Sequence, residues 1–215
     1  MISFTTARKI VSRHLPRPKT RCLELIEAEG RFLSRHVAAT ADAPAFDRAI
    51  MDGFAVRSRD TADAPVILRV VGFIPAGKAW GRRISAGECV GIATGAMMPP
   101  GADVVIKNED VRILAAGRLR VLRRVRKGED VYPRGCDYRK GTLLLRRMTL
   151  LNPARIALLS SQGYRRVEVF APPRVALLTT GYEIVACGRK LQRGQVHDAT
   201  RPMILSGLAR MGVLC

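Results

Sequence analysis

Asp47 and Asp52 flank a Met-Asp-Gly turn that leads directly into an apolar, strand-like segment. A carboxylate beside a glycine can approach a metal ion or a phosphate closely, because glycine adds no side chain and permits a positive φ. Asp-Gly pairs are also frequent in turns that bind nothing. The pair Asp52-Gly53 therefore predicts either an active-site carboxylate or a purely structural turn.

Polar side chains recur at several more glycine-bearing turns. Thr94 and Gly95 offer a hydroxyl group and a close backbone approach to an anion. Later candidates are Asp137, Thr180, Gly181, Glu183, Asp198 and Arg201. For Asp137 and Asp198 the alternative is a turn carboxylate that caps local backbone groups.

The amino-terminal elements that must support these residues are expected to be helical. Apolar residues at three-to-four spacing predict an amphipathic helix over Thr5–His14, which Pro16 ends. Arg21–His36 has a second, less regular helical pattern that Gly30 interrupts. Residues 38–46 form a connector of small residues and proline, which indicates a domain boundary.

Residues 66–145 change character and predict a compact all-β unit, because short β-type runs alternate with glycine and proline. The runs are Val66–Val71, Cys89–Thr94, Val104–Lys107 and Leu119–Val125. Arginines in residues 118–127 lie beside alternating apolar residues, as on a half-exposed strand.

After residue 151 the pattern becomes α/β. Asn152 and Pro153 predict a helix start, and Gly163 is placed to end that helix. Val167–Phe170 and Val175–Thr179 are predicted strands, the second of parallel-sheet type. Ligands of such sheets bind at the carboxyl ends of strands, which is where Thr180 and its neighbours fall. A helix over Arg201–Met211 and a strand beginning at residues 213–215 are also expected.

Composition narrows the class of protein. The 215 residues suffice for one large domain or two small ones, and 47% of them are apolar. No apolar run reaches the ~18 residues of a membrane helix, and the amino terminus lacks the pattern of a signal peptide. Five dispersed cysteines without a C-x-x-C pair argue against a disulfide framework or a zinc site and favour the cytoplasm.

The net charge of +19 predicts attraction to anions, whether nucleic acid, anionic lipid or a phosphorylated substrate. A compositional bias toward arginine is the alternative cause. Nucleic-acid binding through residues 118–127 is disfavoured, because no nucleic-acid motif accompanies them and aromatic residues make up only 5%.

Five segments, in chain order, resemble motifs of the molybdopterin molybdenumtransferase family, which includes bacterial MoeA proteins and the gephyrin E domain. The Met-Asp-Gly segment is the first. The others are residues 91–105 (Thr-Gly-Ala and Pro-x-Gly-x-Asp-x-Val-Val), 134–137 (Arg-x-Gly-Glu-Asp), 180–183 (Ser/Thr-Gly-Asp-Glu) and 194–201 (Gly-Gln-Ile-x-Asp-x-Asn-Arg).

The resemblance implies insertion of molybdate into adenylylated molybdopterin with release of AMP, assisted by Mg²⁺. It implies Asp52, Asp137 and Glu183 as catalytic carboxylates, with Asp52 and Glu183 as metal ligands. It implies Thr94, Gly95, Thr180, Gly181, Asp198 and Arg201 as substrate-binding residues. A homodimer is implied as well.

The fold class implied is α+β and multi-domain. A helix-and-strand dimerisation and linker region would span residues 1–43 with 140–172, an inserted β-domain residues 44–139, and the start of an α/β molybdopterin-binding domain residues 173–215.

Three departures from the family motifs remove an acid or an amide, namely Cys136, Tyr182 and Thr200. The family's Ser-Gly-Gly turn and Gly-Leu-Pro-Gly-Asn-Pro loop are also not found in this sequence. We therefore expect a truncated or split member that does not turn over alone and that a carboxyl-terminal fragment or homologue complements. The alternative is a non-catalytic dimerising or scaffold paralogue.

Overall fold

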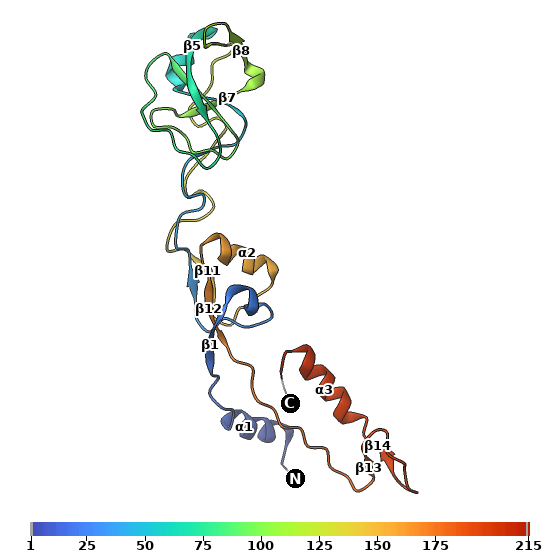
Figure 1. The fold of residues 1–215 in the computed structure, drawn as a ribbon. Helices are drawn as coiled ribbons and strands as arrows, with labels where there is room; N and C mark the ends of the chain where they lie inside the picture. Colours follow the sequence, from blue (N-terminus) through green and yellow to red (C-terminus); the bar gives the residue numbers. More distant parts are fainter. Residues whose placement is uncertain (1, 214) are drawn as a thin grey trace. The chain divides into compact units, whose positions relative to one another are not determined.

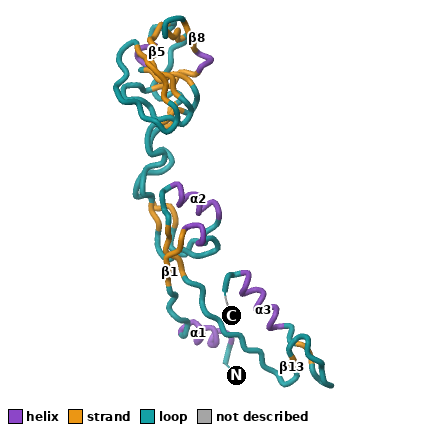
Figure 2. Tube along the Cα trace, viewed as in Figure 1, coloured by secondary structure: helices purple, strands orange, loops and turns teal. Residues whose placement is uncertain are grey.

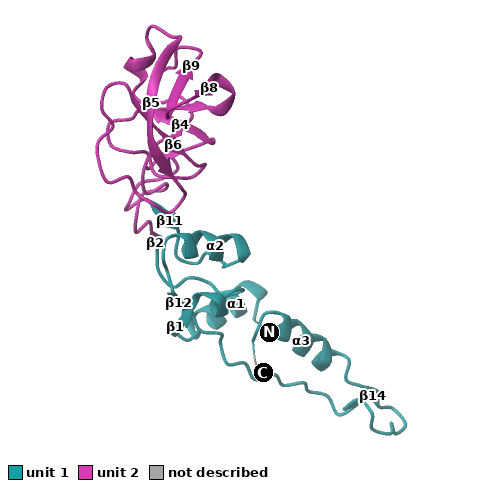
Figure 3. Cartoon of the chain, turned by 45° about the horizontal axis from the view of Figure 1, so that its top comes forward, with its two compact units in different colours: residues 1–37, 143–215 teal, residues 38–142 magenta. Residues whose placement is uncertain are grey.

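The computed structural model describes residues 2–213 and 215, which form two compact units (Figures 1 and 3). Unit 1 contains the chain up to Val37 and from Leu143 onward, and unit 2 contains Ala38–Thr142. The mixture of helices and strands confirms the expected mixed fold class (Figure 2). The predicted division into residues 1–43 with 140–172, 44–139 and 173–215 stays a prediction.

Unit 2 is built around a six-stranded sheet with the strand order β7-β4-β6-β5-β9-β8. Its strands are β4 (Gly53–Val56), β5 (Val66–Ile74), β6 (Glu88–Ile92), β7 (Val104–Lys107), β8 (Val111–Leu114) and β9 (Arg118–Val121). Neighbouring strands are antiparallel except for β5 and β6, which are parallel. A separate pair joins β3 (Arg48–Ala49) to β10 (Val131–Tyr132), and two short 3-10 helices, η2 (Ser58–Thr61) and η3 (Asn108–Asp110), complete the unit.

The neighbouring strands β4 and β7 of this sheet are buried on both faces. In β4, Ala55 packs into one apolar cluster and its neighbour Val56 into another. β7 behaves in the same way, with Val105 in the first cluster and Val104 in the second. Because successive strand residues point to opposite faces, two cores clamp the sheet between them and fix its register.

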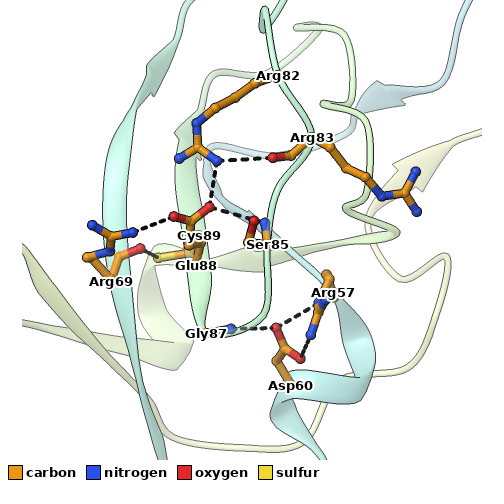
Figure 4. Close-up of polar contacts among 9 residues, drawn as sticks. All are labelled: Arg57, Asp60, Arg69, Arg82, Arg83, Ser85, Gly87, Glu88 and Cys89. Carbon is orange, nitrogen blue, oxygen red and sulfur yellow. Dashed lines mark hydrogen bonds and ion pairs between the residues drawn. The ribbon is translucent and has the colours of Figure 1, made fainter.

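A buried carboxylate ties the loop before β6 to the sheet (Figure 4). Glu88 accepts hydrogen bonds from Arg69 at 2.6 Å, from Arg82 at 2.7 Å and from the Ser85 backbone N–H at 3.1 Å. The Arg82 hydrogen bond is the main reason why the pKa of Glu88 falls to about 2. Glu88 is therefore a charged structural anchor.

Unit 1 contains a small core between a strand pair and a helix. β1 (Thr20–Glu24) runs antiparallel to β12 (Arg166–Phe170), and α2 (Pro153–Ser161) contributes the fully buried Leu159 to the same cluster as Val167 of β12. The remaining elements are α1 (Phe4–Arg13), η1 (Leu25–Ala28), β2 (Val37–Ala38, which crosses into unit 2), β11 (Leu143–Leu145), β13 (Ile184–Val185), β14 (Val196–His197) and α3 (Thr200–Arg210). No helix of the described residues is long and apolar enough to span a bilayer.

Predictions that rested on local signals are confirmed. The helices expected over Thr5–His14 and Arg201–Met211 are α1 and α3, each shifted by one residue. In α2 the Asn152 side chain accepts a hydrogen bond from the Arg155 N–H at 3.0 Å, as an N-cap does. Gly163 follows that helix with a φ of 77°, the left-handed conformation expected there.

Two predictions are wrong. The helical pattern over Arg21–His36 forms β1 and the single turn of η1 instead, because residues 20–24 pair with β12. Val175–Thr179 forms no strand, since none of the described residues supplies a neighbouring strand for it, and Leu178 is 87% exposed. Of the strand expected at residues 213–215, Val213 lies outside any strand and Leu214 lies outside the described residues.

Candidate functional site

The Met-Asp-Gly turn places Asp52 immediately before β4, and backbone packing fixes its position. A Cβ on Gly53 would lie 2.0 Å from the carbonyl oxygen of Ile106 on the neighbouring strand β7. Gly53 does not have a positive φ, contrary to the expectation from the sequence. Glycine is needed here for the close approach of two strands, and that approach holds Asp52 at the end of the sheet.

Asp52 is held by one residue from a distant part of the chain. Its Oδ1 accepts hydrogen bonds from the Thr94 backbone N–H at 2.6 Å and from the Thr94 Oγ1 at 2.8 Å. The backbone N–H bond is the main reason why the pKa of Asp52 is lowered, so the exposed carboxylate is ionised at neutral pH. Among the described residues, no hydrogen-bond donor engages its second oxygen, Oδ2.

A cavity of about 540 Å³ opens beside Asp52 on the sheet of unit 2. Apolar residues and glycines form most of its wall, including Phe54, Phe73 and Gly91. A Cβ on Gly91 would lie 2.9 Å from the Phe73 ring, so glycine keeps this wall open. A ligand-sized, mostly apolar cavity with a fixed carboxylate in its lining is the usual form of a small-molecule site.

Asp137 lies in a second group of unit 2. Its Oδ1 accepts a hydrogen bond from the Tyr132 hydroxyl at 2.6 Å, and this bond raises the pKa of Tyr132 to about 12. The Arg48 guanidinium lies over the Tyr132 ring, 5.0 Å from its centroid. Because β3 pairs with β10 at Arg48 and Tyr132, the motif that carries Asp52 also positions this tyrosine.

Two further carboxylates clamp the loop that bears Asp137. Asp47 accepts the backbone N–H of Arg134 at 2.7 Å. Asp42 accepts the Arg134 side chain at 2.6 Å and the backbone N–H of Lys140 at 2.8 Å. The sequence presented Asp47 as one of two turn carboxylates, and its contact assigns it to loop positioning.

The substrate-binding candidates of unit 1 gather around another cavity, of about 600 Å³. Gly181, Asp198 and Arg201 line it, together with Thr179 and Cys187. Asp198 is only 7% exposed and accepts the Arg201 backbone N–H at 2.9 Å, which is the main reason why its pKa is lowered. Asp198 thus caps the first turn of α3, as the structural alternative describes, and its role in substrate binding stays a prediction.

Glu183 is exposed, and its backbone carbonyl accepts the Val196 N–H at 2.8 Å, which connects β13 to β14. The Glu183 carboxylate lies over Gly181, where a Cβ would be 2.8 Å from its Oε2. Thr180 is exposed beside them. In place of the family's acid, the Tyr182 side chain is completely exposed, at 105%.

The donor groups do not make a metal site by themselves. Across residues 2–213 and 215, no group of three His, Cys, Asp or Glu side chains is arranged to hold a metal ion. The expected ligands Asp52 and Glu183 belong to different units. The described residues therefore form no Mg²⁺ site within either unit.

Sequence reasoning missed Tyr132, Asp42 and the clamping role of Asp47. Each acts on a partner through a fold-dependent contact, and Asp42 reaches residues more than 90 positions away. The sequence offered one signal, Gly135 in the motif at residues 134–137. In the structure Gly135 has a φ of 70°, and a Cβ there would contact Asp42.

Comparison with known proteins agrees with this architecture. The family described as the MoeA N-terminal region (domain I and II) matches residues 2–163. The molybdopterin molybdenumtransferase of Nostoc sp. is 39% identical over 186 residues, which cover 85% of this chain and 42% of the relative. The enzyme of that name from Haemophilus influenzae is 33% identical and covers 94% of this chain and 50% of the relative.

The solved structures give the same result. The crystal structure of a molybdopterin biosynthesis MoeA protein from Pyrococcus horikosii matches 99% of this chain and 55% of its own, with a TM-score of 0.89 and 33% identity. The chain belongs to the family of the MoeA N-terminal region. It spans about half the length of the curated relatives it matches.

Proposed function

We propose that this chain acts in molybdenum cofactor biosynthesis, as the amino-terminal portion of a molybdopterin molybdenumtransferase. The reaction is the insertion of molybdate into adenylylated molybdopterin with release of AMP. One observation carries the proposal: the ionised Asp52 carboxylate is fixed by Thr94 in the lining of a ligand-sized cavity, with one oxygen free of protein donors among the described residues.

Asp52 and Thr94 are suited to positioning a substrate. Both hydrogen bonds from Thr94 go to Oδ1, so Oδ2 can accept a hydrogen bond from a ligand. Suitable donors are a ring N–H group of a pterin or a ribose hydroxyl group. A carboxylate that is already oriented loses little entropy when it binds, which favours a productive geometry. Gly95 continues the Thr94 turn with a φ of 79°, which keeps the approach to this pair open.

The other assignments extend the same proposal. Asp137 acts as a second site carboxylate of unit 2, oriented by Tyr132. Glu183, Thr180 and Gly181 contribute from unit 1, where Arg201 supplies positive charge for an anionic group. Asp198 shapes that site by capping α3. Mg²⁺ held by Asp52 and Glu183 remains a prediction from the family resemblance.

A chimera tests the proposed function. The full chain is joined to the remaining carboxyl-terminal portion of the Nostoc relative, and cofactor and AMP formation are measured from molybdate and adenylylated molybdopterin. The chimera is expected to be active, with the chain alone as a control. An inactive chimera, beside an active full-length relative prepared in the same way, would contradict the proposal.

The decisive variant of that chimera is Asp52→Asn, which keeps the size of the side chain but removes its charge. Turnover should fall by about a hundredfold, in line with the loss of other fixed electrostatic groups at active sites. Asp63→Asn is the matched control, because Asp63 is exposed in the same unit and makes no side-chain hydrogen bond or ion pair among the described residues. Equal turnover in the two variants would remove Asp52 from the site.

A homodimer fits both the catalytic function and the non-catalytic, dimerising alternative, and α1 favours it. None of its residues is buried, and Phe4 and Val11 are 80% and 62% exposed. Such apolar exposure is a surface for self-association. We infer that the chain forms a homodimer, and light scattering should find a dimer at micromolar concentration that Phe4→Ser with Val11→Ser disrupts. A monodisperse monomer of the unaltered chain would contradict this inference.

A further inference from the structure

One edge of the unit 2 sheet is left without a partner. β8 is the last strand of the sheet and pairs only with β9 among the described strands. At the opposite end, β7 receives cover, because the Val105 N–H donates to the carbonyl oxygen of Glu129 at 3.1 Å. The outer edge of β8 therefore presents free backbone donors and acceptors of the kind that pair with another extended chain.

Three arginines line this edge on one face of the sheet. The register places Arg112 opposite Arg120 and Leu114 opposite Arg118, and residues directly opposite each other share a face. Arg112, Arg118 and Arg120 are all exposed. None of the three forms an ion pair with a described carboxylate, whereas Arg123 nearby binds both Asp110 and Glu129.

The other face of β8 carries an exposed apolar residue. Ile113 alternates with Arg112 along the strand and is 78% exposed. β8 thus offers positive charge on one face, an apolar contact on the other, and unpaired backbone between them. We call Arg112, Ile113, Arg118 and Arg120 with the outer backbone of β8 the β8 edge surface.

We propose that the β8 edge surface binds an extended acidic segment of a partner protein, which adds to the sheet as a further strand. Acidic side chains at every second position of that segment would face Arg112 and its neighbours, and the intervening apolar side chains would contact Ile113. Strand addition supplies the backbone hydrogen bonds, and the opposite charges set the register. This role goes beyond cofactor synthesis, although Ile113 and Arg118 also line the cavity beside Asp52, so the two surfaces adjoin.

A nucleic acid fits this surface less well. Single strands bind through aromatic platforms on which bases stack, together with positive charge. The β8 edge surface contains no aromatic residue, while its free backbone suits a peptide. A nucleic acid remains one outcome of the test.

The test measures binding of a fluorescent peptide with alternating Glu and Val to the full chain, by anisotropy at physiological salt. Arg112→Gln, Arg118→Gln and Arg120→Gln together should weaken binding by about tenfold or more. The control replaces the exposed Arg189, Lys190 and Arg193 of unit 1 by Gln, which removes the same charge, and should leave binding within about twofold. Equal losses in both triple variants would overturn the proposal, because net charge alone would then explain binding.

Two further measurements decide between strand addition and general attraction. A peptide of the same composition with its Glu residues grouped together should bind clearly more weakly, and equal binding would overturn the proposal. Bound peptide should slow hydrogen exchange at the amides of residues 111–114 in the unaltered chain, so the test stands even if the triple variant misfolds. Failure of the alternating peptide to bind, or tighter binding of a single-stranded RNA oligonucleotide to the same arginines, would also overturn it.

Discussion

The two units carry their charge in different ways. Unit 2 has 18 Lys and Arg residues and 12 Asp and Glu residues, whereas unit 1 has 19 and 6. The acids of unit 2 hold its loops together, and few acids are available to do so in unit 1. The high positive charge of the chain therefore comes mainly from unit 1, while the architecture that depends on carboxylates lies in unit 2.

Within unit 2, the carboxylates separate by how many of their oxygens are engaged. Hydrogen bonds reach both oxygens in five of them, which are Asp42, Asp60, Glu88, Asp103 and Glu129. Asp52 uses only one oxygen, although it binds Thr94 twice. Asp103 lies in a family motif too, but both of its oxygens accept hydrogen bonds from Ser58. A motif carboxylate with a free oxygen is thus a better site candidate than one without.

The largest expected effect concerns the backbone of unit 2. Gly53→Ala would place a Cβ 2.0 Å from a backbone oxygen of β7, and backbone cannot move aside as a flexible side chain can. The free energy of unfolding of unit 2 should fall by about 3 kcal/mol. Urea unfolding followed by the fluorescence of Trp80 measures this, because the chain's single tryptophan lies in unit 2.

Gly81→Ala is the control for this experiment, since a Cβ there meets nothing within 4 Å and Gly81 has no positive φ. The helical circular dichroism should change little, because the α-helices of the described chain all belong to unit 1. If the two alanine variants unfold at the same urea concentration, the claim that β4 and β7 approach too closely for a side chain at position 53 is wrong.

A smaller effect is expected in unit 1. Asn152→Ala removes the side-chain acceptor that caps α2, so the stability of unit 1 should fall by about 1 kcal/mol. Unfolding is followed at 222 nm, where the helices dominate, with Ser160→Ala on the same helix as control. If Asn152→Ala shifted the Trp80 transition as much as the transition at 222 nm, the two units would unfold together. Their stabilities could then not be compared separately.

The stability of unit 2 is expected to depend on pH through Glu88. The pKa of Glu88 is lowered from 4.5 to about 2, so its stabilising contribution is complete above 4.5 and is lost as the pH falls toward 2. Glu88→Gln should make unit 2 less stable at neutral pH and flatten its dependence on pH in that window. Acid unfolding read from Trp80 tests this, with the exposed Glu109→Gln as control. An unchanged acid profile in Glu88→Gln would show that the carboxylate is not an anchor.

The sequence predicted those parts of the fold that neighbouring residues decide. The Asn152 cap, the Gly163 stop and the strands around Val104–Lys107 depend on local signals. Residues 21–36 and 175–179 misled the interpretation, because pairing with a distant strand, or the lack of such a strand in the described chain, decides their structure. The secondary-structure propensity of a segment does not show whether a distant strand is present to pair with it.

The same division holds for the candidate site. The family resemblance located Asp52 and Thr94 as separate motifs, and the fold brings them together across 42 positions. Tyr132 and Asp42 carried no motif, so only their contacts with the Asp137 loop give them a role. The supporting residues of a site are therefore harder to predict than the residues that face its ligand.

The smallest expected effect separates the two carboxylates of the opening motif. Asp47 accepts one backbone N–H, from Arg134, and asparagine keeps a carbonyl oxygen that can accept the same bond. Asp47→Asn should therefore lower the turnover of the chimera by about twofold at most, whereas Asp52→Asn loses a charge that faces the cavity. Asp47→Ala removes the acceptor altogether, so hydrogen exchange at the Arg134 amide should quicken in that variant and stay nearly unchanged in Asp47→Asn. If Asp47→Asn reduced turnover as strongly as Asp52→Asn, the charge of Asp47 would matter to the reaction, and the separation of the motif into one site carboxylate and one positioning carboxylate would be wrong.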